Sequence, residues 1–179
     1  MSSKKEKIFK EILSYLLVIM GAAAFAISVR VFIFEPFIVP TPSMVPTLQV
    51  SDKVIVNKLA FKIKPIKRGD IVVFHSSIGK DLVKRAIALE GDEITLTDSG
   101  DVYINGEKIN EEYVLKDYNI SYENETVVVE KGKVFVMGDN RNNSYDSRYI
   151  GSISKEDVFG EVVFIYLPLT RFGRVNSKI

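Results

Sequence analysis

The chain has 179 residues, a length that suits one domain with an extra segment and is long enough to bury a substantial core. Its 24 lysines and arginines nearly balance 23 aspartates and glutamates, and the net charge of +1 provides no basic field, so nucleic acid is not an expected partner. The absence of cysteine rules out disulfides and thiolate metal sites. Any Ser-His-Asp triad would depend on the single histidine, His75, which follows a β-branched run and is interpreted as a non-catalytic strand end.

The N-terminal segment has the pattern of a membrane anchor. Lysines dominate residues 1–11, and an uncharged, mostly apolar run extends from Ile12 to Val29. We predict a cytoplasmic N-terminus at 1–11, a transmembrane anchor at 12–34 and an extracytoplasmic domain at 35–179, because lysines before a span stay in the cytoplasm. A cleavable signal peptide ending at Ala22–Ala26 is the alternative, but apolar residues continue past these alanines, which favours an uncleaved anchor in the cell membrane.

From Ser51 onward the sequence has a β pattern of short β-branched runs separated by Gly, Pro or Asp. Asn105-Gly106 is the strongest hairpin signal and predicts a type I′ turn. The predicted strands are Val54–Val56, Asp70–Phe74, Leu82–Leu89, Glu93–Thr97, Asp101–Ile104, Glu107–Ile109, Thr126–Val129, Val134–Met137 and Val158–Leu167. Because no helices alternate with them, we predict a mainly β domain, an antiparallel β-barrel or folded sheet, with one helical turn near Ser154–Asp157.

A basic segment lies between the first two predicted strands. Its basic residues alternate with apolar ones: Lys58, Lys62, Lys64, Lys67 and Arg68 with Phe61, Ile63 and Ile66. One interpretation is a solvated strand edge that lysines protect from pairing. The other is a surface that rests on anionic lipid head groups, with Phe61 dipping into the membrane.

The stretch from Pro40 to Leu48 contains three prolines, which remove backbone donors and exclude an ordinary helix or central strand. Within it, Ser43 would keep its hydroxyl and its N–H free of regular ladders, as a nucleophile and an oxyanion donor both require. By itself the stretch also fits a proline-rich turn with a solvated serine. The nucleophile hypothesis therefore needs a base from elsewhere in the chain.

The informative base is Lys84, which lies inside the predicted strand Leu82–Leu89. Alternation on a strand places Lys84 on one face with Leu82 and Ala86, between small or apolar neighbours. Burial there would lower the pKa of the lysine by several units and produce a neutral amine that can act as a base. The alternative is an ordinary strand lysine that extends to water.

A third polar segment, Gly138 to Arg148, follows a predicted strand and is rich in Asn, Asp and Ser. Such a composition forms turns held by side-chain to backbone hydrogen bonds, and it could be only a polar loop. Within it, Asp146 and Arg148 could form an ion pair that braces the loop, and Ser144 could hold a lysine amine in place.

Together the three segments resemble one family, the bacterial type I signal peptidases, which are membrane-anchored serine proteases with a Ser-Lys dyad. The matching motifs are Ser43-Met44-Val45-Pro46-Thr47, Lys84-Arg85 with Gly91-Asp92, and Gly138 to Arg148, in the family's order. With the anchor, the resemblance covers nearly the whole chain. The region from Glu93 to Glu130 is short, which resembles the compact enzymes of Gram-positive bacteria.

The resemblance implies a role for each matching residue. Ser43 would be the nucleophile, Lys84 the general base, and Ser144 the hydroxyl that orients the lysine amine. Thr41 would complete the oxyanion hole, and Asp146 and Arg148 would form a supporting ion pair. Shallow substrate pockets would be lined by Phe37, Val39, Pro40, Met44 and Val83.

The implied reaction is removal of signal peptides from secretory preproteins, downstream of the export machinery, by cleavage after an A-x-A type site on the outer face of the membrane. The implied partners are these preproteins and membrane lipid, and no metal or cofactor is implied. A self-cleaving Ser-Lys protein of the same fold is an alternative, although residues 1 to 35 contain no DNA-binding domain. The second alternative is a catalytically inactive, membrane-tethered binding module with the same β fold.

Overall fold

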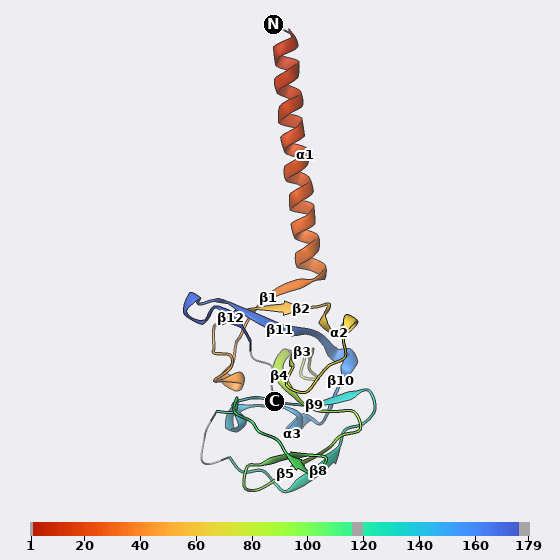
Figure 1. Cartoon of the computed structure of the whole chain (residues 1–179), viewed down its shortest axis with the longest axis vertical. Coiled ribbons are helices and arrows are strands. Elements are labelled where there is room, and N and C mark those ends of the chain that lie inside the picture. Colours follow the sequence, from red (N-terminus) through yellow and green to blue (C-terminus); the bar gives the residue numbers. More distant parts are fainter. Residues whose placement is uncertain (1, 116–119, 176–179) are drawn as a thin grey trace.

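The computed structural model describes residues 2–115 and 120–175, which form a long helix followed by two antiparallel β-sheets (Figure 1). The helices are α1 (Ser2–Phe32), α2 (Ala60–Ile63) and α3 (Ser147–Ile150). The strands are β1 (Phe34–Ile38), β2 (Lys53–Asn57), β3 (Ile71–His75), β4 (Asp81–Leu89), β5 (Glu93–Leu96), β6 (Val102–Ile104), β7 (Glu107–Lys108), β8 (Glu125–Val128), β9 (Lys133–Met137), β10 (Ile153–Ser154), β11 (Val158–Leu167) and β12 (Gly173–Arg174). Short 3₁₀ turns cover Pro42–Met44, Arg141–Asn143, Lys155–Asp157 and Leu169–Arg171.

Helix α1 extends away from the sheets as a single rod (Figure 1). Its segment Lys7–Arg30 is long and apolar enough to cross a membrane, and its most apolar stretch is not buried against the protein. The helix ends two residues before the predicted end of the anchor at residue 34. Phe34 is instead the first residue of β1, where it pairs with Asn57. We did not predict β1 because it contains Pro36, which is tolerated here in an edge strand.

The larger sheet has the strand order β1-β2-β11-β3-β4-β9-β10, with β12 paired to β11. All of its pairings are antiparallel, so the predicted mainly β antiparallel fold is confirmed. Within the described residues this order ends at β1 and β10, which makes the sheet a folded, open one rather than a closed barrel. Strand β4 lies between β3 and β9, so Lys84 stands in the interior of the sheet.

The smaller sheet has the order β7-β6-β5-β8 and lies at the end of the molecule opposite α1 (Figure 1). The hairpin between β6 and β7 is confirmed, because Asn105 and Gly106 have φ values of 54° and 82°, the left-handed pair that a type I′ turn requires. The short region from Glu93 to Glu130 therefore holds a compact second sheet.

The basic segment after β2 is not a strand edge, and that interpretation was wrong. Ala60–Ile63 forms the one-turn helix α2, and the backbone N–H of Lys58 donates to the Ile33 carbonyl at 2.8 Å, immediately after the end of α1. Four residues are too few to show helical periodicity, so the alternation of basic and apolar residues suggested a strand instead. Ile63 is 81% exposed on α2. The helical turn predicted near Ser154–Asp157 is confirmed as Lys155–Asp157.

The buried apolar residues next to Ser43 hold its segment against the larger sheet. Val39, Met44 and Leu48 are each at most 2% exposed and belong to one core cluster with residues of β2, β3 and β11. Burial of a side chain such as Met or Leu stabilises the folded state by about 1.5–3 kcal/mol. The proline-rich segment is thus fixed by its own apolar residues, even though it contributes no strand.

Candidate active site

Ser43 lies in the middle of the 3₁₀ turn Pro42–Met44 and is 6% exposed. The turn is closed by a hydrogen bond from the Val45 N–H to the Pro42 carbonyl at 3.1 Å. A second contact reaches it from the distant polar loop, since the Asn140 N–H donates to the Ser43 carbonyl at 3.0 Å. The serine is therefore held from both sides, outside any β ladder.

Lys84 projects from β4 toward this serine. Its Nζ lies 2.6 Å from Ser43 Oγ, a hydrogen-bond distance, and the side chain is 2% exposed. The predicted alternation is confirmed, because the neighbouring residues Val83 and Ala86 are buried in two different core clusters. The structure thus brings together two residues separated by 41 positions in the sequence.

Burial lowers the pKa of Lys84 from its ordinary value of 10.5 to about 8, because the interior disfavours the charged ammonium. Three nearby charges modify this effect: Asp146 and Asp139 favour the ammonium, and Arg148 disfavours it. The amine is therefore neutral in a substantial fraction of molecules near neutral pH. A hydroxyl next to a neutral amine has a base in contact with it.

Thr41 stands two residues before Ser43 in an extended conformation, with φ −133° and ψ 157°. Its Oγ1 lies 3.3 Å from Ser43 Oγ. The hydroxyl therefore borders the position at which an attacking Ser43 oxygen would meet a carbonyl group.

Ser144, Asp146 and Arg148 form one connected group where the polar loop enters α3. Asp146 is fully buried and accepts bonds from Ser144 Oγ at 2.6 Å and from Arg148 Nε and Nη2 at 2.8 Å each. Burial alone would raise the pKa of Asp146, but these bonds, the Arg148 charge and the Gly138 N–H lower it, so the carboxylate stays ionised. Ser144 donates its proton to Asp146, and in the described part of the chain it forms no hydrogen bond with Lys84.

A cleft of about 160 Å³ opens beside Ser43 and Lys84. Four of the five residues predicted to line substrate pockets border it: Val39, Pro40, Met44 and Val83. The fifth, Phe37, does not border it and instead packs against the core cluster under the serine. The cleft is also bordered by Lys80, Asp81 and Leu82, which the sequence did not predict and which lie where β4 begins.

His75 is exposed at the end of β3, and its Nδ1 lies 2.7 Å from Asp81 Oδ1. Its ring stacks on Phe159 with centroids 4.5 Å apart. In the described ranges, no group of three or more His, Asp or Glu side chains is arranged to hold a metal ion.

The sequence profile of the family described as "Signal peptidase, peptidase S26" matches residues 12–167. The chain belongs to this family. The resemblance to type I signal peptidases is thereby confirmed over most of the chain.

Similar proteins carry the same family name. Signal peptidase I P of Bacillus subtilis subsp. natto is 38% identical over 181 residues, which cover 96% of this chain and 97% of that protein. Probable signal peptidase I-1 of Synechocystis sp. is 37% identical over 170 residues, which cover 89% of this chain and 84% of that protein. A crystal structure of a signal peptidase I from Enterococcus faecalis V583 shares 34% identity, covers 55% of this chain and 97% of that one, and superposes with a TM-score of 0.49.

The three motifs also meet at a buried ion pair that their sequences did not reveal as such. Arg85, on the face of β4 opposite Lys84, is fully buried and donates from Nε and Nη2 to Asp139 at 2.8 and 2.7 Å. Thr47, four residues after the nucleophile candidate, donates to the same carboxylate. The pair thus connects all three motifs, and its signal in the sequence was an arginine whose neighbours on the same face of the strand, Val83 and Ile87, are apolar.

Gly138 was predicted only as the start of the polar loop, but its lack of a side chain lets two parts of the site approach each other closely. A Cβ at this position would lie within 3.0 Å of Ser144 Oγ and of the Ser43 carbonyl oxygen, closer than real Cβ atoms approach. The loop and the serine turn therefore meet across the bare backbone of Gly138.

Proposed function

We propose that this member of the signal peptidase family is a membrane-anchored serine endopeptidase that removes signal peptides from secretory preproteins, with Ser43 as nucleophile and Lys84 as general base. Family membership supports the class of reaction. The observation that carries the assignment of residues is the 2.6 Å separation between Lys84 Nζ and Ser43 Oγ in an interior that favours the neutral amine. That separation also argues against an inactive binding module, which would have no need of a buried lysine.

In the proposed first step, the neutral Lys84 amine takes the Ser43 proton while Oγ bonds to the scissile carbonyl carbon. The resulting oxyanion accepts hydrogen bonds from the Thr41 hydroxyl and the Ser43 N–H. The C–N bond then breaks, the Lys84 ammonium protonates the leaving amine, and the mature protein departs. The signal peptide remains bound to Ser43 as an ester.

In the second step Lys84, neutral again, takes a proton from a water molecule that attacks the ester carbonyl. The C–O bond to Ser43 breaks, and Oγ regains a proton from Lys84. The products are the signal peptide with a free carboxyl group, which releases its proton to solvent, and the unmodified enzyme. Every proton that moves to or from Ser43, the leaving amine and the attacking water passes through Lys84, so no second titratable group is required.

The Ser144, Asp146 and Arg148 group is assigned a positioning role. The ionised Asp146 lies close enough to influence Lys84 and is itself fixed by Arg148 and the Gly138 N–H. Ser144 holds this carboxylate against the loop and orients the lysine amine only through it.

The size of the cleft supports the predicted preference for small residues before the cut. Its volume of about 160 Å³, bordered by apolar residues such as Val39, Met44 and Val83, is shared by the first and third residues before the cut, and it suits two alanine-sized side chains better than two aromatic rings. We therefore assign cleavage after an A-x-A type sequence. The test is a matched pair of preproteins, one with Ala and one with Phe at the first and third positions before the cut. Mass spectrometry should find a single cut, after the alanine, and equal cleavage of both substrates would contradict the assignment.

Helix α1 is assigned as an uncleaved membrane anchor with residues 1–11 in the cytoplasm and the domain from residue 35 outside, where it meets preproteins that the export machinery has delivered. The exposed Ile63 and Lys62 of α2, next to the end of α1, would contact anionic lipid head groups. In this arrangement the cleft lies near the membrane that holds the apolar part of a signal peptide.

A further inference from the structure

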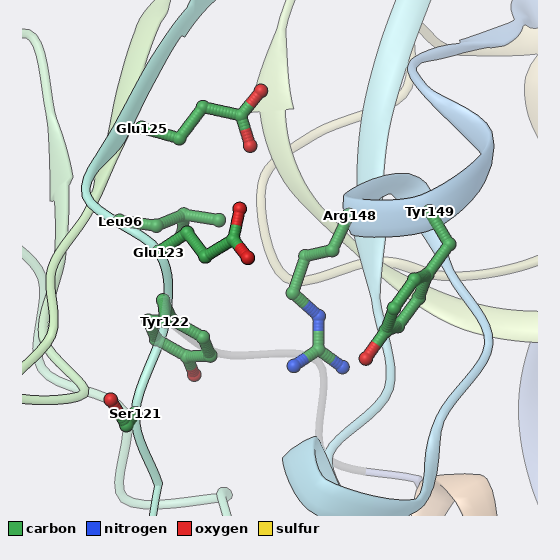
Figure 2. A pocket seen from close by; sticks show the side chains of 7 residues that line it. All are labelled: Leu96, Ser121, Tyr122, Glu123, Glu125, Arg148 and Tyr149. Carbon is green, nitrogen blue, oxygen red and sulfur yellow. The ribbon is translucent and has the colours of Figure 1, made fainter.

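A second cavity, of about 430 Å³, lies between the smaller sheet and α3 (Figure 2). One wall comes from the smaller sheet: Leu96 of β5, Glu125 of β8, and Ser121, Tyr122 and Glu123 from the chain before β8. Arg148 and Tyr149 of α3 form the other wall. It shares no bordering residue with the cleft at Ser43. Nothing in the proposed reaction uses it.

The charges around this cavity are unbalanced. Figure 2 shows the carboxylates of Glu123 and Glu125 on one wall, facing Arg148 and Tyr149 on the other. The Arg148 charge is balanced by Asp146, which accepts its Nε and Nη2 donors. By contrast, neither glutamate forms an ion pair with a residue in the ranges 2–115 and 120–175. Among the described residues the cavity therefore offers two carboxylates without an ion-pair partner beside the Tyr149 ring, a combination that favours a cation.

Strand β8 forms an open edge beside the same cavity. It is the last strand in the order β7-β6-β5-β8, so one side of its backbone pairs with β5 and the other with no described strand. Glu125 pairs with Leu96, which places both side chains on the cavity face of the sheet. Val128, 61% exposed, lies on the opposite face.

We propose that β8 binds an extended polypeptide segment as an additional strand, with basic side chains on the cavity face beside Glu123 and Glu125 and apolar side chains on the face of Val128. Backbone hydrogen bonds to the open edge would supply affinity, and the alternating pattern would supply selectivity. The Arg148 Nη1 group, which has no hydrogen bond in the described part of the chain, can donate to a carbonyl of the bound segment.

The occupant we assign is the part of the preprotein that follows the cut, an assignment that rests on the proposed function. The smaller sheet lies at the end of the molecule opposite α1 (Figure 1), so a substrate chain that leaves the cleft away from the membrane passes toward it. A second copy of this chain is a poor occupant, because its β8 strand, Glu-Thr-Val-Val, has no basic side chain to place beside Glu123 and Glu125. The alternative explanation is that the glutamates only protect the β8 edge from pairing with other chains. The experiments below distinguish this alternative from binding of a preprotein.

The first experiment measures binding without cleavage. A blocked, fluorescein-labelled hexapeptide of alternating Lys and Val is titrated with the full chain in detergent micelles, and fluorescence anisotropy is recorded. Two labelled hexapeptides serve as controls. One alternates Glu and Val, which reverses the charge, and the other has three Val followed by three Lys, which removes the alternation. The alternating basic peptide should bind most tightly, and the Glu123→Gln, Glu125→Gln double variant should weaken it about five-fold. Glu107→Gln, on the opposite edge strand β7, should leave binding unchanged.

Equal binding of the three peptides, no binding, or no effect of the double variant would mean that the glutamates only protect the edge, and the proposal would be overturned. The second experiment compares preproteins with Lys or Ala at alternate positions after the cut. The Lys substrate should have the lower KM with unchanged kcat, and the double variant should remove this difference. Peptide binding with an unchanged KM would contradict the preprotein as occupant. Absence of any cleavage would instead contradict the proposed function, while the binding result stands independently.

Discussion

At the scale of single residues, the central feature is a lysine placed where its charge is costly. Lys84 is 2% exposed, and the same burial that disfavours the ammonium makes the neutral amine available to Ser43 at 2.6 Å. A single side chain can then act as base and as acid in turn. Both functions require that its pKa lie close to the pH at which the enzyme works.

The pH dependence of activity follows from this pKa. Because the pKa of Lys84 is lowered to about 8 and the neutral amine is the base, kcat/KM should rise with pH, by about ten-fold per unit below pH 8, and level off above it. The measurement is a profile of preprotein processing from pH 6 to pH 10. A rise centred near the ordinary lysine value of 10.5 would contradict the assignment, as would a flat profile.

Thr41 should affect the transition state much more than binding. Its hydroxyl borders Ser43 Oγ at 3.3 Å, and removal of one oxyanion donor costs about 3 kcal/mol in the transition state, or roughly 100-fold in kcat. Single-turnover kinetics of Thr41→Val should therefore show that loss with a nearly unchanged KM. Thr41→Ser keeps the hydroxyl and should keep most of the activity. If Thr41→Val turns over at the parent rate, Thr41 is not part of the oxyanion hole.

At the scale of elements, β4 supplies one functional residue from each face, Lys84 to the serine turn and Arg85 to Asp139. This division was predictable, because alternation on a strand depends only on position in the sequence. The helices α2 and α3 were not predictable, since each has four residues and neither shows a helical period. Phe37 was predicted to line a substrate pocket and instead packs against the core. The sequence could not distinguish these positions, because an apolar residue near Ser43 fits a pocket wall and a core position equally well.

The junction between β9 and the polar loop should not tolerate even a methyl group. In Gly138→Ala the new Cβ would overlap Ser144 Oγ and the Ser43 carbonyl oxygen, so either the loop or the serine turn has to move. A displacement of about 1 Å can lower turnover by ~100-fold. We expect that loss in a processing assay. The matched control, Gly173→Ala, has no atom within 4 Å of the added Cβ and should keep full activity; full activity of Gly138→Ala would show that this contact is unimportant.

At the scale of the whole molecule, helix α1, the larger sheet and the smaller sheet follow one another along the long axis (Figure 1). The anchor and most strands were predicted because they depend on local composition and periodicity. The insertion of β11 between β2 and β3 was not, because that pairing joins residues about a hundred positions apart and is decided by the packing of the whole core. The motifs nevertheless led to the hypothesis that Ser43 and Lys84 act together, because the resemblance to the family does not depend on knowing which strands pair.

Contact of α2 with the membrane can be measured directly, because the chain contains no tryptophan. Ile63→Trp places a single reporter on the exposed face of α2, next to the end of α1. In vesicles with anionic lipid its emission should shift to the blue and be quenched by brominated lipid. Val128 is also exposed but lies on the distant smaller sheet, so Val128→Trp should show neither effect. Identical behaviour of the two reporters would contradict contact between α2 and the membrane surface.

The most direct test of the central claim compares the parent protein in detergent with its Ser43→Ala and Lys84→Ala variants on one secretory preprotein, with the cut position read by mass spectrometry. Circular dichroism of each sample shows that it is folded. The proposed dyad predicts a single cut after a small residue in the parent and none in either variant, because each lacks one partner of the 2.6 Å contact. A folded parent that does not cut, or a Lys84→Ala variant that cuts at the parent rate, would contradict the account.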